Sequence, residues 1–195
     1  MKKGKYILIY NYDYSKLGLT LESEFFISSI FTLQTEIKAK SKYNFLFQYE
    51  EMFIYSFSQL KILIKKYADI LFWDNELKKF RMKNDKWLMR KTLIKENNET
   101  YLSFPTWLFP LNKVHKLNFT QLYVIALVVS YFYDRKDFSW ANETIANKLG
   151  MVSKESVMKN VSKLYDKGLI NIKPTNRTNV LYVTDKLLDY EHFTR

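Results

Sequence analysis

Residues 142–173, NETIANKLGMVSKESVMKNVSKLYDKGLINIK, constrain the fold of this chain more than any other stretch. Their apolar residues recur at helical spacing in two runs, which predicts two helices. Gly150 can end the first helix in the left-handed conformation, Ser153 can cap the second helix, and Gly168 can end it. The sequence therefore predicts two short helices joined by a tight turn. Their inward positions are expected to be Ile145, Ala146, Leu149, Val157, Val161 and Leu164.

Regular elements are also expected on both sides of this helix pair. The apolar segment from Thr120 to Tyr133 predicts a largely buried helix capped by Thr120. FSW at 138–140 can form one short extended pairing. After the helix pair, LINIK and VLYVT flank a turn rich in Pro, Asn and Thr, which predicts a β-hairpin. The expected order is helix, short strand, helix, turn, helix, hairpin.

This order, from Thr120 to Asp185, resembles the winged helix-turn-helix domains of bacterial, phage and plasmid DNA-binding proteins. The resemblance implies that the third helix enters the major groove of DNA and that the hairpin, the wing, flanks it. One position departs from the pattern, because Ala141 stands where a Ser or Thr cap is expected; Asn142 is the next candidate for that cap. The framework positions of the pattern are Ile145, Ala146, Leu149, Gly150, Ser153, Val157, Leu164, Gly168, Leu169 and Ile170.

The first half predicts a similar order with an additional insertion. We expect, in turn, a strand at 5–12, a helix capped by Thr20, an insertion near 39–55, a helix capped by Ser56 or Ser58, a third helix over 74–92, and a short wing that turns at Asn97 and Asn98. Residues 82–94 and 158–170 share Met, Lys, Asn, Leu, Lys, Leu and Ile, and this echo aligns Lys83 with Lys159. The expected fold is α+β, helix-rich, with two tandem winged-helix domains at 1–100 and 101–195.

The composition favours a polyanionic partner and a reducing compartment. The chain has 31 Lys and Arg against 20 Asp and Glu, a net charge of +11, which favours nucleic acid. It has no cysteine, which excludes disulfides and thiolate chemistry, and its two histidines do not indicate a metal site. The longest apolar run, at 122–133, is too short for a membrane span. We expect a cytoplasmic protein with no membrane partner.

No pattern in the sequence indicates catalysis. The four glycines are too scattered for a phosphate-binding loop or a dinucleotide fingerprint. His115 and His192 lie far apart, so they do not form the paired-histidine site that a nicking enzyme would need. The sequence therefore predicts a protein that is not an enzyme and that holds no cofactor and no metal.

The candidate DNA-binding residues are polar and cationic side chains on the two expected third helices and on the second wing. Cations there would neutralise phosphates, whereas Asn, Ser and Lys can also meet base edges. In the second half the candidates are Ser153, Lys154, Ser156, Lys159, Asn160, Lys163, Lys173, Asn176 and Arg177. In the first half they are Lys79, Lys83, Lys86 and Arg90, which fall on one side of the expected third helix.

These features lead to three functional hypotheses. The two tandem units, and LSFPTWLF at 102–109 before a long helix, resemble the tandem winged-helix replication initiators of plasmids and phages. That resemblance implies binding to double-stranded DNA at an origin and recruitment of host replication proteins. The alternatives are a transcriptional regulator on an operator, and an interaction module in which the aromatic segment at 43–55 binds a protein while the second half alone touches DNA. A homodimer is left open by the sequence.

Overall fold

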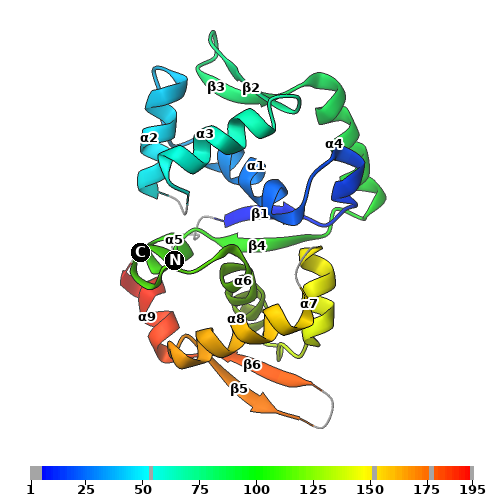
Figure 1. Ribbon diagram of the computed structural model, residues 1–195, viewed down its shortest axis with the longest axis vertical. Coiled ribbons are helices and arrows are strands. Elements are labelled where there is room, and N and C mark those ends of the chain that lie inside the picture. Colours follow the sequence, from blue (N-terminus) through cyan, green and yellow to red (C-terminus); the bar gives the residue numbers. More distant parts are fainter. Residues whose placement is uncertain (1–5, 53–54, 151–152, 176–177, 194–195) are drawn as a thin grey trace. The chain divides into compact units, whose positions relative to one another are not determined.

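The computed structural model is an α+β structure in which helices alternate with small two-stranded sheets (Figure 1). Within the described part of the chain, no helix is long and apolar enough to cross a membrane. The structure describes residues 6–52, 55–150, 153–175 and 178–193.

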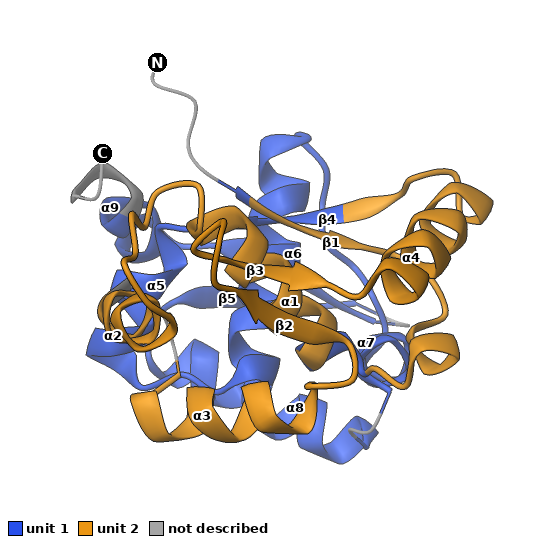
Figure 2. Cartoon of the chain, turned by 90° about the horizontal axis from the view of Figure 1, so that it is seen from above, with its two compact units in different colours: residues 1–6, 20–22, 102–195 blue, residues 7–19, 23–101 orange. Residues whose placement is uncertain are grey.

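The chain divides into two compact units, which Figure 2 shows in different colours. Each unit contains its own buried helices and its own hairpin. Unit 1 comprises residues 1–6, 20–22 and 102–195, and unit 2 comprises residues 7–19 and 23–101.

Unit 1 is built around a helix that is buried along most of its length. Residues 121–129 of this helix, α6, are all buried, and α5, α8 and β6 pack against it. An apolar run without a polar face is typical of a core helix, and here it confirms the expected burial. The elements of unit 1 are β4 (Tyr101–Pro105), α5 (Leu108–His115), α6 (Phe119–Tyr133), α7 (Asn142–Leu149), α8 (Lys154–Asp166), β5 (Ile170–Pro174), β6 (Asn179–Val183) and α9 (Asp185–Phe193).

Local signals explain where α7 and α8 begin and end. Gly150 ends α7 at φ 75°, a left-handed conformation that favours glycine. The side chain of Ser153 caps α8 by accepting a hydrogen bond from the backbone N–H of Ser156. These predictions are confirmed, as are the β5–β6 hairpin and a short pairing of Phe138 with Leu181. The predicted inward residues of both helices are buried: Ile145, Ala146, Leu149, Val157, Val161 and Leu164.

Two predicted caps in unit 1 are wrong. Helix α6 begins at Phe119, and Asn118 caps it in place of Thr120, in a reciprocal capping box with Gln121. Helix α7 begins at Asn142, so this residue does not act as its cap. Ala141 occupies the cap position of α7, without a side-chain hydrogen bond.

Aromatic rings contact one another in the core of unit 2. The ring of Phe26 lies 5.7 Å from that of Tyr55, and the ring of Phe80 lies 5.3 Å from that of Phe45 and 5.1 Å from that of Trp73. The elements of unit 2 are β1 (Tyr6–Tyr10), η1 (Tyr14–Leu17), α1 (Leu21–Leu33), α2 (Lys42–Met52), α3 (Phe57–Lys66), β2 (Leu71–Asp74), β3 (Lys79–Met82) and α4 (Asn84–Glu96).

The predicted third helix over residues 74–92 is wrong in its first part. An antiparallel hairpin, β2–β3, occupies that part, and α4 begins only at Asn84. The Asp74 carboxylate accepts hydrogen bonds from the backbone N–H groups of Glu76 and Leu77, which stabilises the turn. Burial alternates along β3, as expected for a strand with one covered face.

Two further expectations for the first half are corrected. The segment near 39–55, predicted as an insertion, contains the regular helix α2. Asn97 and Asn98 do not form the turn of a wing. They follow the end of α4, and the next segment is β4.

The two units share one order of elements. In unit 2, a strand, four helices, a hairpin and a further helix run from β1 to α4, and in unit 1 the same kinds of element run from β4 to α9. In this correspondence α2 matches α7, α3 matches α8, and the β2–β3 hairpin matches β5–β6. The sequence echo does not follow it, because Met82 lies in β3 whereas Met158 lies in α8.

Buried positions support this correspondence residue by residue. Counted from the capping serines, Ser56 of α3 and Ser153 of α8, the buried residues fall at the same steps. The matched pairs are Leu60 with Val157, Ile64 with Val161, and Tyr67 with Leu164. In the preceding helices the matched buried pairs are Phe45 with Ile145, Leu46 with Ala146, and Tyr49 with Leu149.

Candidate nucleic-acid interface

Helix α8 presents several of the predicted residues on its solvent side. Because Val157, Val161 and Leu164 are buried, the side chains between them face away from the core. The exposed candidates on α8 and at its start are Ser153, Lys154, Lys159 and Lys163, and Ser156 is half-buried.

Glu155 is an acidic residue within this mainly cationic face. The backbone N–H of Glu155 and the hydroxyl of Ser153 hold the pKa of its carboxyl below the usual value, and Lys154 and Lys159 act in the same direction. A negative side chain in the first turn of a helix interacts favourably with the helix dipole. Glu155 therefore has a local structural reason to be ionised beside the lysines.

Asn160, a predicted DNA contact, points into unit 1 instead. Its side chain is 8% exposed. It donates to the backbone carbonyl of Ser156 at 2.8 Å and accepts a hydrogen bond from the Asn118 side chain at 2.9 Å. The cap of α6 is thus tied to α8 through two amide side chains. Asn160 is therefore not on the exposed margin of α8 where helical spacing placed it, because its polar atoms are engaged inside the unit.

The β5–β6 hairpin lies across a polar pocket from the start of α8. Lys173 is exposed on β5, where it pairs with Val180 of β6. A pocket of about 250 Å³ is lined by the beginnings of α7 and α8 and by the hairpin, including Asn142, Lys154 and Thr175. The predicted candidates Asn176 and Arg177 lie outside the described residues.

The first-half candidates do not lie on one helix. Lys79 is on β3, Lys83 precedes α4, and Lys86 and Arg90 are on α4. Lys79 and Lys83 are exposed and Lys86 is half-buried. The expected cationic face over this segment is therefore divided between a hairpin and a helix, and Lys83 does not occupy a position equivalent to that of Lys159.

Arg90 is buried and is bound to an acidic residue. Its guanidinium donates from Nε to the Glu24 carboxylate at 3.2 Å and forms a second bond to the same carboxylate through Nη2. Glu24 is fully buried, and it also accepts hydrogen bonds from Ser28 and from Tyr12. Arg90 is therefore not on the solvent side where helical spacing placed it, and its charge is neutralised inside unit 2.

Tyr12 completes this buried polar cluster. Burial, and then the neighbouring Glu24 carboxylate, raises the pKa of the Tyr12 phenol, so the hydroxyl stays protonated and can donate. The Arg90 guanidinium also lies 5.6 Å from the centre of the Tyr10 ring. The cluster joins α1 to α4 and to the segment after β1.

The helix in unit 2 that corresponds to α8 is α3. The sequence analysis did not predict α3 as a DNA-binding helix. Ser56 caps α3 in a capping box with Gln59, and this local signal could have identified the match with Ser153. Counted from these caps, Lys66 corresponds to Lys163, whereas Ile62, which is 67% exposed, corresponds to Lys159. Residues on α3 that are exposed to solvent are Ser58, Gln59, Lys61, Ile62, Lys65 and Lys66.

Comparisons with known proteins add no relative to this description. No protein-family model matches the chain, and searches of curated proteins and of solved structures returned no match.

Proposed function

We propose that this chain binds double-stranded DNA through α8 and the β5–β6 hairpin of unit 1. The observation that carries the proposal is the succession α6, α7, α8, β5–β6, with lysines on the solvent side of α8. This is the order of elements in a winged helix, whose third helix enters the major groove. The same order in unit 2 leads us to propose two tandem winged helices.

In this proposal the lysines of α8 provide most of the affinity. Lys159 and Lys163 would neutralise phosphates and release counterions, which makes binding sensitive to salt. Ser156, half-buried in the first turn of α8, would approach the base edges. On the other side of the pocket, Lys173 would approach the sugar-phosphate backbone, and Arg177 remains a candidate for the minor groove.

Unit 2 would contribute less to DNA binding than unit 1. Its helix α3 has Lys66 at the position of Lys163, but Ile62 replaces Lys159. An exposed isoleucine cannot neutralise a phosphate. We therefore propose α8 as the main DNA-reading helix and α3 as a weaker second one.

The test compares equal charge changes on three helices. The double substitution Lys159→Glu with Lys163→Glu should weaken duplex binding at least about tenfold and flatten its dependence on salt. Lys65→Glu with Lys66→Glu on α3 should have a smaller effect. Lys83→Glu with Lys86→Glu, at the start of α4, is the control for net charge. If the α8 pair weakens binding no more than the α4 pair does, reading through α8 is wrong.

The biological use of the duplex site is a separate part of the proposal. We propose a replication initiator that binds origin repeats, on the resemblance to plasmid and phage initiators given above, with a transcriptional regulator as the second candidate. Selection of bound duplexes from a random pool separates them. Direct repeats would support an initiator, whereas a single palindrome would support a regulator that binds as a dimer.

A further inference from the structure

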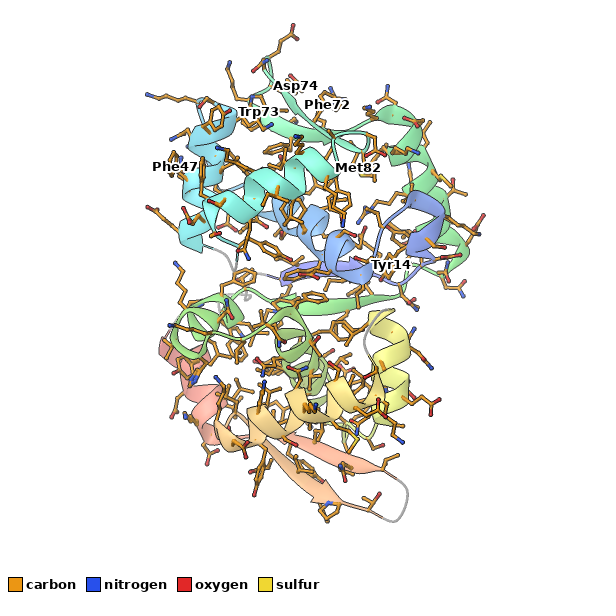
Figure 3. All side chains as sticks on the ribbon, viewed as in Figure 1. Tyr14, Phe47, Phe72, Trp73, Asp74 and Met82 are labelled. Carbon is orange, nitrogen blue, oxygen red and sulfur yellow. The ribbon has the colours of Figure 1, made fainter. Side chains whose placement is uncertain are left out.

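Unit 2 exposes a cluster of aromatic rings on α2 and α3. Tyr43 is 59% exposed and Phe47 is 56% exposed. The ring of Phe47 stacks on that of Phe57 with centres 4.3 Å apart and planes inclined by 12°, and Tyr43 lies 6.5 Å from Phe57. Phe47 is marked on α2 in Figure 3. We call Tyr43, Phe47 and Phe57 the aromatic cluster.

The matched positions in unit 1 are polar or charged. With the buried residues of the two units aligned, Tyr43 corresponds to Glu143, Phe47 to Asn147, and Phe57 to Lys154. The fold of this pair of helices therefore does not require large apolar residues at these positions. Exposed aromatic rings gathered on one face mark an interaction site more often than scattered ones do.

Lysines border the aromatic cluster. The Lys61 ammonium lies 5.4 Å from the centre of the Phe57 ring, and Lys65 is exposed one turn further along α3. Lys42 precedes Tyr43 at the start of α2, and Glu51 follows Phe47 by one turn. The face thus combines an apolar centre with a mainly positive border, which fits a partner that is apolar and acidic.

Two other occupants fit this geometry less well. A nucleic-acid base would have to stack on an open aromatic face, but Phe47 contacts one side of the Phe57 ring and the Lys61 ammonium also lies over this ring. A second copy of the chain, bound symmetrically, would present the same mainly positive border, and like charges oppose that contact.

We propose that the aromatic cluster of unit 2 binds an acidic amphipathic segment of another protein. Apolar side chains at helical spacing in that segment would pack on Tyr43 and Phe47, and its carboxylates would lie against Lys61 and Lys65. The site contains no residue of α8, the main proposed DNA-reading helix, and it shares only Lys65 with the weaker contribution proposed for α3.

The test uses a labelled helical peptide with leucines along one face and glutamates on the other. The full-length chain should bind it more tightly than a scrambled peptide of the same composition or a version with lysine for glutamate. Phe47→Asn, which introduces the residue of unit 1 at the matched position, should weaken peptide binding at least about tenfold. Lys61→Glu should weaken it as well and should favour the lysine peptide instead.

The controls separate this site from the DNA surface and from other occupants. Phe47→Asn should leave duplex binding through α8 unchanged, and Lys159→Glu with Lys163→Glu should leave peptide binding unchanged. Equal binding of the acidic and scrambled peptides would overturn the proposal. So would a cluster-dependent affinity for single-stranded oligothymidine, or self-association of the chain that Phe47→Asn abolishes. Far-ultraviolet circular dichroism and thermal unfolding establish that each variant is folded.

Discussion

At the scale of single residues, two predicted DNA contacts are internal structural residues. Arg90 and Asn160 are polar side chains on helices, and sequence spacing placed both near an exposed face. Their partners, Glu24 and Asn118, lie 66 and 42 residues away in the chain. Helical periodicity describes only one helix, so it contains no information about a buried partner on another. By contrast, Lys159 and Lys163 are exposed, as their spacing predicted.

The Glu24–Arg90 pair should make a large contribution to stability. Arg90→Met would leave the Glu24 carboxylate buried without its counter-charge, and we expect a loss of about 3–5 kcal/mol in the free energy of unfolding. Replacing both residues, with Glu24→Leu added, should recover much of this loss. Urea denaturation provides the measurement.

The exposed Asp74–Arg81 pair serves as the matched control. Its two charged groups lie 3.3 Å apart on the β2–β3 hairpin, and the Arg81 side chain is 46% exposed. Exposed pairs contribute little, so Arg81→Met should cost at most about 1 kcal/mol. If Arg81→Met and Arg90→Met lowered the free energy of unfolding by similar amounts, burial would not explain the contribution of the Glu24–Arg90 pair.

At the scale of elements, prediction succeeded where local stop and start signals were present. In unit 1, Gly150 and Ser153 mark the limits of α7 and α8 in the sequence itself. In unit 2, the β2–β3 turn contains no glycine; Lys78 adopts the left-handed conformation at φ 50°. The residues before and within that turn include good helix formers, and a pattern without glycine predicted a helix across the hairpin.

The cap of α3 provides a test of the match between α3 and α8. Ser56 accepts a hydrogen bond from the backbone N–H of Gln59, whereas Ser58 is exposed within the first turn. Ser56→Ala should lower the free energy of unfolding by about 1 kcal/mol. Ser58→Ala, a chemically identical change, should alter it by no more than about 0.5 kcal/mol. Equal effects in chemical denaturation would remove Ser56 as the cap.

The contact between α5 and α9 should make stability depend on pH. The His115 imidazole lies 2.9 Å from the Tyr190 hydroxyl, and burial, followed by the charges of Lys186 and Lys167, lowers the pKa of His115. The unfolded chain therefore binds more protons than the folded chain as pH falls below about 6.5, and stability decreases there.

Thermal unfolding between about pH 7.5 and pH 5.5 measures this effect. The melting temperature of the wild-type protein should fall over this range. The melting temperature of His115→Gln should fall less, because glutamine does not titrate. Tyr190→Phe keeps the histidine and should retain most of the decrease. An unchanged slope in His115→Gln would rule out His115 as its source.

At the scale of the whole molecule, the net charge indicates a class of partner, and the exposure of each cationic side chain decides which of them can contact it. The net charge of +11 favours polyanions, but it does not identify a surface. The structure distinguishes lysines that are exposed on α8 from Arg90, which is neutralised by Glu24. The sequence predicted that the two halves share an order of elements, but it matched the wrong elements. The similar segments at 82–94 and 158–170 belong to different elements.

The salt dependence of duplex binding measures how many of these charges participate. If Lys154, Lys159, Lys163 and Lys173 each contact a phosphate, the logarithmic salt slope should include about −0.9 for each of them. Lys159→Gln should therefore reduce the slope by about one, and Lys79→Gln on the β2–β3 hairpin should reduce it less. Equal reductions would mean that binding is spread over both units.

The shared buried positions of α3 and α8 also make their outer faces exchangeable. The double substitution Phe57→Lys with Ile62→Lys would give α3 lysines at the positions of Lys154 and Lys159 while leaving Leu60 and Ile64 in place. The reverse graft, Lys154→Phe with Lys159→Ile, would remove two lysines from α8 and leave Lys163 in place. Because the two helices share their buried positions, the exposed residues of one helix can guide substitutions on the other without changes to either core.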